Sequence, residues 1–444
     1  MLSSFATKFF SSAAGAERKK GVELASVEVH DIETAPEKRP RTLKHLIRLN
    51  HVTNSVMYHD LQFHNHAPHI LGSAYLLGAS PAQLNSIYDE EAKELEHWED
   101  SPEEVSQHDW QSYLGDKRFQ RAYVDFFEDQ LVRYNYDWQS IVHDYLFNGK
   151  EPLINGIVGG LGHPLIHLGY AFELSNRELA MEALALTATN YSFLHKYLDD
   201  PSYTARPAPT ASISTQTPLT ILASIAADPA LTNLFRTPGP DNIGPLFENA
   251  KTESALLKHW NAWSAPSQSP TAAFSDLQKA ATALLVTSLT TETPRHDFFL
   301  LHLLTTTHAL RILFPLIPSK HHISLLRQHF LLTLALYTTQ LTPHIDASLI
   351  PAYSLPAGKD TWTYLAHECL HGRWAKDAHF VKGVRALKVA AETWPHDADF
   401  YLHAAVKFAV EFDGWGGFAP FNQEDREFLG EFREGGERGV FKDE

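Results

Sequence analysis

Two histidines stand four residues apart in the stretch GIVGGLGHPLIHLGYAFEL, residues 156–174. Pro164 is of a type favoured in the first turn of a helix, so we expect His163 at a helix start and His167 one turn later. At that spacing both imidazoles lie on one side of the helix, which suits a single metal ion. Hydrogen-bonded core histidines share this spacing, so the pair alone leaves both interpretations open.

The glycines before His163 do not carry a nucleotide fingerprint. The stretch contains no G-x-G-x-x-G and no G-K-[ST] sequence, and no clear strand pattern precedes it. We therefore expect Gly159, Gly160 and Gly162 to allow a close approach of the backbone, for example to a flat aromatic ligand.

Two further segments place histidines at helix starts or in apolar surroundings. His66 and His69 flank Pro68, which repeats the arrangement of a histidine followed by a proline-started apolar helix. One of them could instead be a helix cap and the other a solvated surface residue. His302 interrupts a nearly continuous apolar run, and an unpaired buried imidazole costs about 1–3 kcal/mol. Its partner must be either a backbone carbonyl or a metal.

The segment DAHFVKGVRALK, residues 377–388, repeats a basic residue every three positions: His379, Lys382 and Arg385. Most such helical faces are solvated and pair with acids. A lysine that stays neutral in a dry pocket behaves differently, because its amine is a nucleophile that can take up carbon dioxide as a carbamate. The carbamate would be an anionic oxygen ligand.

Helical periodicity dominates the chain, for example in RELAMEALALTATNYSFLHKYL, residues 177–198, and alternating strand patterns are hard to find. We predict a mainly α protein. It would consist of a flexible N-terminal arm at residues 1–40 and one large all-helical domain at residues 41–444, with the metal site in the helix core. The start of the arm is rich in serine, alanine and basic residues and loosely resembles a mitochondrial presequence, but we favour a cytoplasmic location.

Composition excludes several classes of function. The net charge of −16 comes without clustered lysines and arginines, so we do not expect nucleic-acid binding. The single cysteine, Cys369, excludes an intrachain disulfide and a cysteine-rich zinc site. The most apolar run, residues 298–317, contains two histidines, an arginine and a proline, which predicts a buried helix rather than a membrane span. A metal would therefore need histidine and oxygen ligands.

Taken together and in this order, four segments resemble the questin oxidase-like family of fungal proteins, which includes aflatoxin-pathway oxidoreductases. The resemblance spans about residues 45 to 400 of the sequence. Its patterns are HNHxxH before an apolar helix ending in LGAS (64–80), GGxxHPLIHLGYxxE (159–173), DFFLxHxxT (297–305) and DxHxxKxxRAL (377–387).

The resemblance implies an oxidoreductase of fungal secondary metabolism that uses O2 and non-haem Fe(II). Its substrate would be an aromatic polyketide of the hydroxyanthraquinone type, oxidised by Baeyer–Villiger-like oxygen insertion or by oxidative ring cleavage. It also implies a metal held by histidines and a carboxylated lysine, which fall here on His66, His163, His167, His302 and Lys382. The residues expected to surround and orient these ligands are His69, His379 and Arg385.

Two alternatives remain beside this interpretation. Electrons for oxygen insertion could come from NADPH without a bound metal, although the sequence carries no nucleotide fingerprint. The chain could also be a non-catalytic helical binding protein whose histidines hold structural zinc, in which case the site would be closed by four protein ligands.

Overall fold

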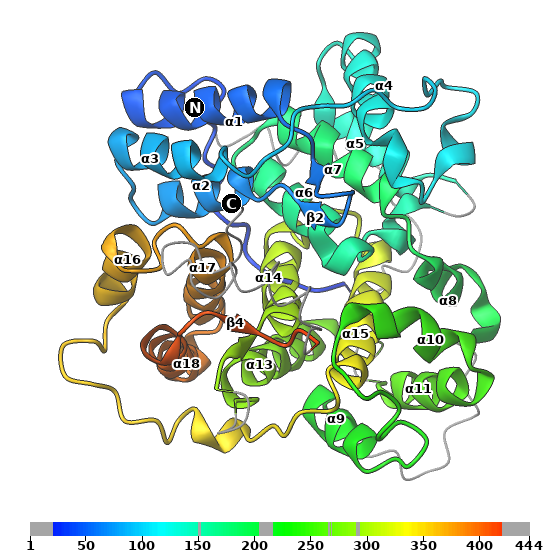
Figure 1. Cartoon of the computed structure of the whole chain (residues 1–444), viewed down its shortest axis with the longest axis vertical. Coiled ribbons are helices and arrows are strands. Elements are labelled where there is room, and N and C mark those ends of the chain that lie inside the picture. The colour runs from blue at the N-terminus through cyan, green and yellow to red at the C-terminus, as the bar shows by residue number, and fades with distance from the viewer. Residues whose placement is uncertain are drawn as a thin grey trace.

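The structure, a computed structural model, describes residues 21–149, 152–203, 216–264, 267, 269–289 and 294–419. Within these ranges the regular structure is almost entirely helical, which confirms the mainly α prediction (Figure 1). The α-helices are α1 (Lys38–Thr53), α2 (Ala67–Leu76), α3 (Pro81–Glu91), α4 (Gln120–Arg133), α5 (Trp138–Phe147), α6 (His163–Glu173), α7 (Arg177–Thr189), α8 (Lys196–Asp199), α9 (Pro218–Ala226), α10 (Ile243–Glu248), α11 (Ala250–Ala262), α13 (Pro270–Thr287), α14 (Phe298–Leu313), α15 (His322–Thr339), α16 (Trp362–His371), α17 (Ala378–Thr393) and α18 (Ala398–Glu411).

In the part of the chain that the structure describes, four two-residue strands form two small pairs. Strands β1 (Met57–Tyr58) and β2 (Phe63–His64) are antiparallel and lead into α2. Strands β3 (His296–Asp297) and β4 (Trp415–Gly416) are parallel. Because β3 runs directly into α14, this second pair ties a late segment of the chain to the start of that helix.

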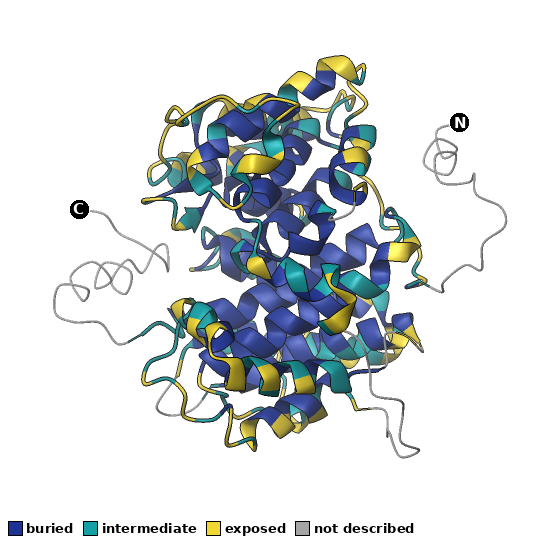
Figure 2. Ribbon diagram, turned by 90° about the vertical axis from the view of Figure 1, so that its right-hand side faces the viewer, coloured by how far each residue is buried: buried dark blue, intermediate teal, exposed yellow. Residues whose placement is uncertain are grey.

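Four helices close a ring at the centre of the molecule. Helix α2 packs on α6, α6 on α14, α14 on α17, and α17 again on α2. The ribbon coloured by burial shows that the inner helices are buried almost along their whole length (Figure 2). Every residue of α14 is buried, so the apolar run is a core helix as predicted. Among the described helices, none is long and apolar enough to cross a membrane.

The described part of the predicted N-terminal arm lies against the helical body. The backbone N–H of His30 donates to the carbonyl oxygen of Glu173 at 2.8 Å, and Ile32 is fully buried. Helix α1 begins at Lys38. The presequence-like residues 1–20 lie outside the described residues, and the division of the chain into an arm and a domain stays a prediction.

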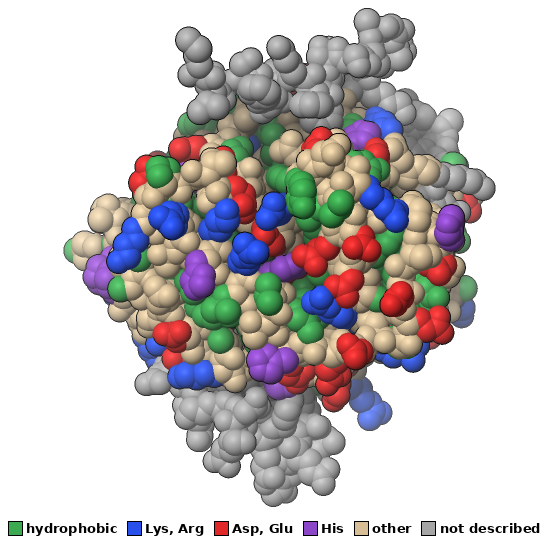
Figure 3. Space-filling view, turned by 90° about the horizontal axis from the view of Figure 1, so that it is seen from above, with side chains coloured by type: hydrophobic (Ala, Val, Ile, Leu, Met, Phe, Trp, Pro, Cys, Tyr) green, Lys and Arg blue, Asp and Glu red, His purple; other side chains and the backbone are tan. Residues whose placement is uncertain are grey.

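One face of the molecule shows how charge is distributed on the surface (Figure 3). Basic and acidic side chains share this face, with histidines among them. The lone Cys369 does not contribute to the surface, because it is buried in α16.

Candidate metal centre

Four histidines, one at or near the start of each helix of the ring, come together in what we call the histidine cluster: His66, His163, His302 and His379. His66 directly precedes the first residue of α2, His163 is the first residue of α6, His302 lies one turn into α14, and His379 lies in the first turn of α17. One ring nitrogen from each lies within 4.8 Å of the others. The Nε2 atoms of His66 and His163 are 2.8 Å apart.

The start of α2 is held by an asparagine network. The side-chain oxygen of Asn65 accepts the backbone N–H of Ala67 at 3.0 Å, which satisfies a free donor of the first turn. The side-chain amide of Asn65 donates to the carbonyl oxygen of Ser55 and to Asn50, each at 3.0 Å. These bonds fix the backbone on both sides of His66.

A glycine loop brings His163 against α14. Gly162 has a left-handed φ of +80°, which glycine adopts without steric cost. A Cβ at this position would lie 2.2 Å from Cγ2 of Thr306 in α14. At Gly162, the close approach that the sequence predicted is therefore an approach of the backbone to helix α14.

Aspartate caps start the other two helices of the ring. Asp297 accepts the backbone N–H groups of Phe299 and Leu300 at 2.8 and 2.9 Å. Asp377 accepts those of His379 and Phe380 at 2.9 and 2.8 Å. Capping of this kind stabilises a helix start by about 0.5–2 kcal/mol. The caps thereby fix the starts of the two helices that carry His302 and His379.

Hydrogen bonds to carbonyl groups determine the tautomer of two cluster histidines. Nδ1 of His163 donates to Gly160 O at 2.6 Å, and Nδ1 of His302 donates to Phe298 O at 2.9 Å. Their Nε2 atoms therefore carry lone pairs when the rings are neutral. Nε2 of His302 and Nε2 of His379 have no hydrogen-bond partner among the described residues.

The electrostatic surroundings keep the four cluster histidines neutral. Burial lowers the pKa of each of them below its ordinary value, and nearby positive charge lowers these pKa values further. Neutral imidazole is the form that binds metals.

Lys382 lies one turn beyond His379 and is 1% exposed. Burial lowers the pKa of its amine to about 7, while the charges of Asp377 and Glu91 oppose that shift. Its Nζ has no hydrogen-bond partner in the part of the chain that the structure describes. Its charge is close enough to lower the pKa of His66 further. A buried amine that is partly neutral near pH 7 is thus available beside the cluster.

These residues fit a single metal ion. Imidazole nitrogens lie about 2.0–2.1 Å from a bound transition metal such as zinc, so neighbouring ligand atoms are about 3 Å apart and opposite ones about 4.2 Å apart. The pair of Nε2 atoms at 2.8 Å matches neighbouring ligands. The widest spacing in the set, 4.8 Å, would close with a shift of roughly half an ångström.

Comparison with known proteins assigns the chain to a family. The sequence profile of the questin oxidase-like family matches residues 63–387. The chain belongs to the questin oxidase-like family. The matched range contains all four histidines of the cluster and Lys382.

Relatives of this questin oxidase-like protein are fungal oxidoreductases. A Baeyer-Villiger oxidase from Pestalotiopsis microspora is 24% identical over 393 residues, which cover 83% of this chain and 85% of the relative. The questin oxidase of Aspergillus terreus is 25% identical over 369 residues, covering 78% and 79% of the two chains. The oxidoreductase AflY of Aspergillus parasiticus is 31% identical over 151 residues, covering 32% and 30%. The protein is accordingly an oxidoreductase related to enzymes of fungal secondary metabolism.

The questin oxidase-like site brings together most, but not all, of the residues predicted as ligands. His66, His163 and His302 meet in the cluster, with Lys382 beside them. His167 does not share it, because its Nε2 bonds to Glu182 at 2.7 Å and its Nδ1 bonds to His69 at 3.0 Å. His69, expected beside the ligands, is thereby linked to His167.

The other two residues expected around the ligands have different surroundings. His379 supplies the fourth nitrogen of the cluster itself. Arg385 pairs with the buried carboxylate of Glu173, and its guanidinium lies 5.6 Å from the ring centre of Tyr170. Glu182 was not predicted from the sequence, although a carboxylate inside the apolar stretch 179–186 was a visible signal.

Proposed function

We propose that this protein is a non-haem iron-dependent oxygenase of hydroxyanthraquinone-type polyketides, acting by Baeyer–Villiger-like oxygen insertion or by oxidative ring cleavage. The observation that carries this proposal is the set of four buried, neutral imidazoles whose nitrogens converge, with a buried amine beside them. Relatives named questin oxidase and Baeyer-Villiger oxidase support the substrate class and the type of reaction.

In this proposal the metal is held by His66, His163, His302 and His379, with Lys382 as a carbamate. Imidazole nitrogens combined with an anionic oxygen suit Fe(II). Bound iron would supply one-electron chemistry with dioxygen. A closed set of four histidines alone would also suit structural zinc. The buried amine beside them favours a centre with a fifth, anionic donor, because an unpaired lysine in that position is otherwise costly.

The protein residues themselves favour an ionised substrate. Four neutral imidazoles add no charge to a divalent cation, and one carbamate leaves the centre with a net charge of about +1. A phenolate would therefore be favoured over a neutral phenol. Burial of the cluster also excludes water, which strengthens this attraction. NADPH in place of a metal remains the alternative for oxygen insertion.

Metal analysis of protein purified without oxygen tests the proposed centre. We expect about one iron per chain in the wild type and its loss in His302→Gln. His329→Gln is the matched control, because His329 is equally buried in α15 but bonds to Leu303 O at 2.9 Å outside the cluster. The circular dichroism spectra of both variants should remain those of a helical protein. Iron retained in His302→Gln would overturn the assignment.

Oxygen uptake tests the reaction, with questin as the probe. Ring cleavage by a dioxygenase places both oxygen atoms in the product and needs no external reductant. Oxygen insertion by a monooxygenase sends one atom to water and consumes two electrons and two protons, so uptake would then depend on an added reductant such as NADPH. Iron-loaded protein that consumes no oxygen under either condition would refute the proposed activity on this substrate.

The carbamate has its own test in Lys382→Met, which keeps the length and apolar stem of the side chain. We expect lower iron content in this variant at any bicarbonate concentration. In the wild type, iron loading should rise when bicarbonate is added to protein prepared without carbon dioxide. Equal iron content in the variant and the wild type would remove Lys382 from the ligand set.

A further inference from the structure

A row of hydrogen-bonded side chains begins beside the histidine cluster. The ring of His69 lies 5.6 Å from that of His66, centre to centre. Its Nε2 faces Nδ1 of His167 at 3.0 Å, and Nε2 of His167 faces Glu182 at 2.7 Å. Nδ1 of His69 is buried and has no partner among the described side chains and backbone. The inner end of the row is thus a free ring nitrogen next to the proposed centre.

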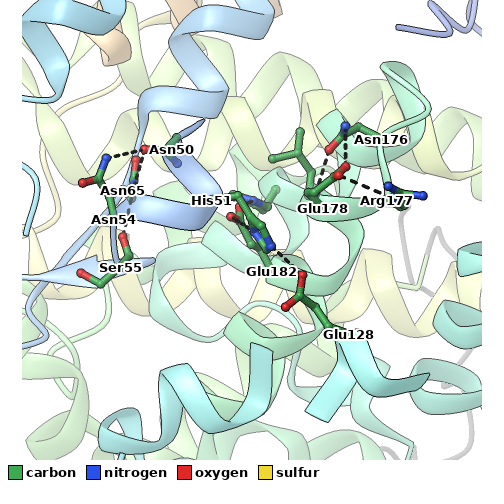
Figure 4. Close-up of polar contacts among 12 residues, drawn as sticks. Asn50, His51, Asn54, Ser55, Asn65, Glu128, Asn176, Arg177, Glu178 and Glu182 are labelled. Carbon is green, nitrogen blue, oxygen red and sulfur yellow. Dashed lines mark hydrogen bonds and ion pairs between the residues drawn. The ribbon is translucent and has the colours of Figure 1, made fainter. Parts of the chain in front are cut away.

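The same row continues outward from Glu182 to the surface. The second carboxylate oxygen of Glu182, in α7, faces Nδ1 of His51, in α1, at 2.7 Å. Nε2 of His51 faces Glu128, in α4, at 2.9 Å, and Figure 4 shows His51 between the two carboxylates. The side chain of Glu128 is 41% exposed, whereas those of His51 and Glu182 are 6% and 2% exposed. The row therefore spans from the core to solvent.

Donors and acceptors alternate along the whole row. Ionised carboxylates only accept, so His51 donates from both ring nitrogens and is an imidazolium. His167 donates from Nε2 to Glu182, which leaves its Nδ1 to accept from Nε2 of His69. Burial lowers the pKa of His51, but the hydrogen bonds and charges of the two glutamates outweigh burial and raise it. Burial raises the pKa of Glu182, but its two histidine partners outweigh that effect and lower it.

We infer that His69, His167, Glu182, His51 and Glu128 form a proton relay between the centre and solvent, an inference that rests on the proposed function. A phenolic hydroxyl of the substrate gives its proton to Nδ1 of His69, and the Nε2 proton of His69 passes to Nδ1 of His167. The Nε2 proton of His167 passes to Glu182. The imidazolium of His51, which already holds a proton on Nδ1, gives its Nε2 proton to Glu128, and Glu128 releases it to water; Glu182 and His51 are then both neutral. The net result is a phenolate and one proton in solvent, with no electron transferred.

The extent of the row distinguishes a relay from simple orientation of a ring. Orienting one imidazole takes one carboxylate or carbonyl partner. Here the row continues past Glu182 through a buried cation to a second carboxylate, and the desolvation of such buried charges is costly. The reverse shift, when a product oxygen is reprotonated, restores the starting tautomers of both neutral histidines.

The inner carboxylate offers the sharpest test, in Glu182→Gln, because an amide keeps the shape but does not carry a proton. Glu178→Gln is the matched control: Glu178 is buried on the same helix and bonds to Asn176 at 3.0 Å, outside the row. Iron-loaded protein is mixed with questin under anaerobic conditions in weak buffer, and a pH-indicator dye reports proton release.

We expect the wild type and Glu178→Gln to release about one proton per bound questin, and Glu182→Gln to release it at least about tenfold more slowly. Added imidazole buffer should accelerate release in Glu182→Gln but not in the wild type or Glu178→Gln, because a mobile base can replace the relay but would not repair a structural defect. Release from Glu182→Gln at the wild-type rate, without dependence on buffer, would overturn the relay.

A second variant covers the case in which Glu182→Gln does not fold. Glu128→Gln changes the half-exposed outer end and should slow proton release less, again with recovery in concentrated buffer. Wild-type release rates in Glu128→Gln at every buffer concentration would also overturn the relay, because the exit group would then be dispensable.

Nitrogen NMR of the histidines separates failure of the relay from failure of the proposed function. Without iron or substrate, the relay requires His51 protonated on both nitrogens at pH 7 and His167 protonated on Nε2. Single histidine variants assign the signals. A neutral His51, or a His167 protonated only on Nδ1, overturns the relay even if iron and oxygen uptake are normal. A wild type that binds no iron but shows both predicted protonation states refutes the proposed function and leaves the proton order supported.

Discussion

Replacing Gly162 by alanine tests how the loop before α6 positions the cluster. The φ of +80° at this position costs an L-residue about 1–2 kcal/mol. The new Cβ would also lie 2.2 Å from Cγ2 of Thr306, and relief of such overpacking costs typically about 1–3 kcal/mol. We therefore expect Gly162→Ala to lower the free energy of unfolding by about 2–5 kcal/mol, measured by guanidinium denaturation.

Two further variants separate the backbone cost from the overpacking cost. Gly78 has a φ of +105° and no atom within 4 Å of an added Cβ, so Gly78→Ala should show only the backbone cost of about 1–2 kcal/mol. Thr306→Ser removes Cγ2 and keeps the hydroxyl that donates to His302 O at 2.7 Å. In the double variant Gly162→Ala/Thr306→Ser, most of the overpacking cost should therefore be recovered.

The Gly162→Ala variant also tests whether the loop positions a ligand of the proposed metal centre. His163 follows Gly162 directly, so a loop that shifts away from α14 moves one of the four cluster nitrogens. We expect Gly162→Ala to lose iron at temperatures where its circular dichroism is still that of a folded protein, whereas Gly78→Ala keeps it. A Gly162→Ala that costs no more than Gly78→Ala, or is not rescued by Thr306→Ser, would refute the steric argument.

The remaining predictions concern buried charge. Arg385→Met leaves the Glu173 carboxylate unpaired and should cost about 3–5 kcal/mol in denaturation experiments, with partial recovery when Glu173→Gln is added; no recovery would contradict the pairing. The pKa of Glu182 is lowered from 4.5, so its contribution is present above pH 4.5 and disappears as pH falls, and Glu182→Gln should flatten the acid-induced fall in Tm. The pKa of His51 is raised from 6.5, so its contribution is complete below pH 6.5 and disappears as pH rises, and His51→Gln should flatten the alkaline fall in Tm. Iron content should not fall until the pH is well below 6.5, because burial lowers the pKa of the four cluster histidines; half-loss at pH 6.5 in a titration would contradict this.

Local rules were sufficient to predict where the histidine-bearing helices begin. Pro164 predicted a helix start at His163, and Pro68 predicted one beside His66, and both helices begin there. The apolar run predicted the buried helix α14. These features depend on residues within one turn of each other, so the sequence alone contains the required information.

Which histidines enter the cluster depends on packing between segments that are distant in the sequence. Spacing alone placed His163 and His167 on one side of a helix, where either could face the metal. In the structure α6 contacts both α14 and α7. His163 lies in the cluster, while Nε2 of His167 bonds to Glu182 of α7. That partner lies 15 residues away and is visible only once both helices are packed.

Packing between helices is also the reason why His379 was expected beside the ligands instead of among them. A face with His379, Lys382 and Arg385 three residues apart shows that the side chains share a direction, but not how deep each one lies. Packing of α17 against both α14 and α2 places the first of these residues at the cluster, while Arg385 meets Glu173 of α6. Periodicity thus predicts which residues share a helical face, and only the neighbouring helices decide which residue on it reaches the histidine cluster.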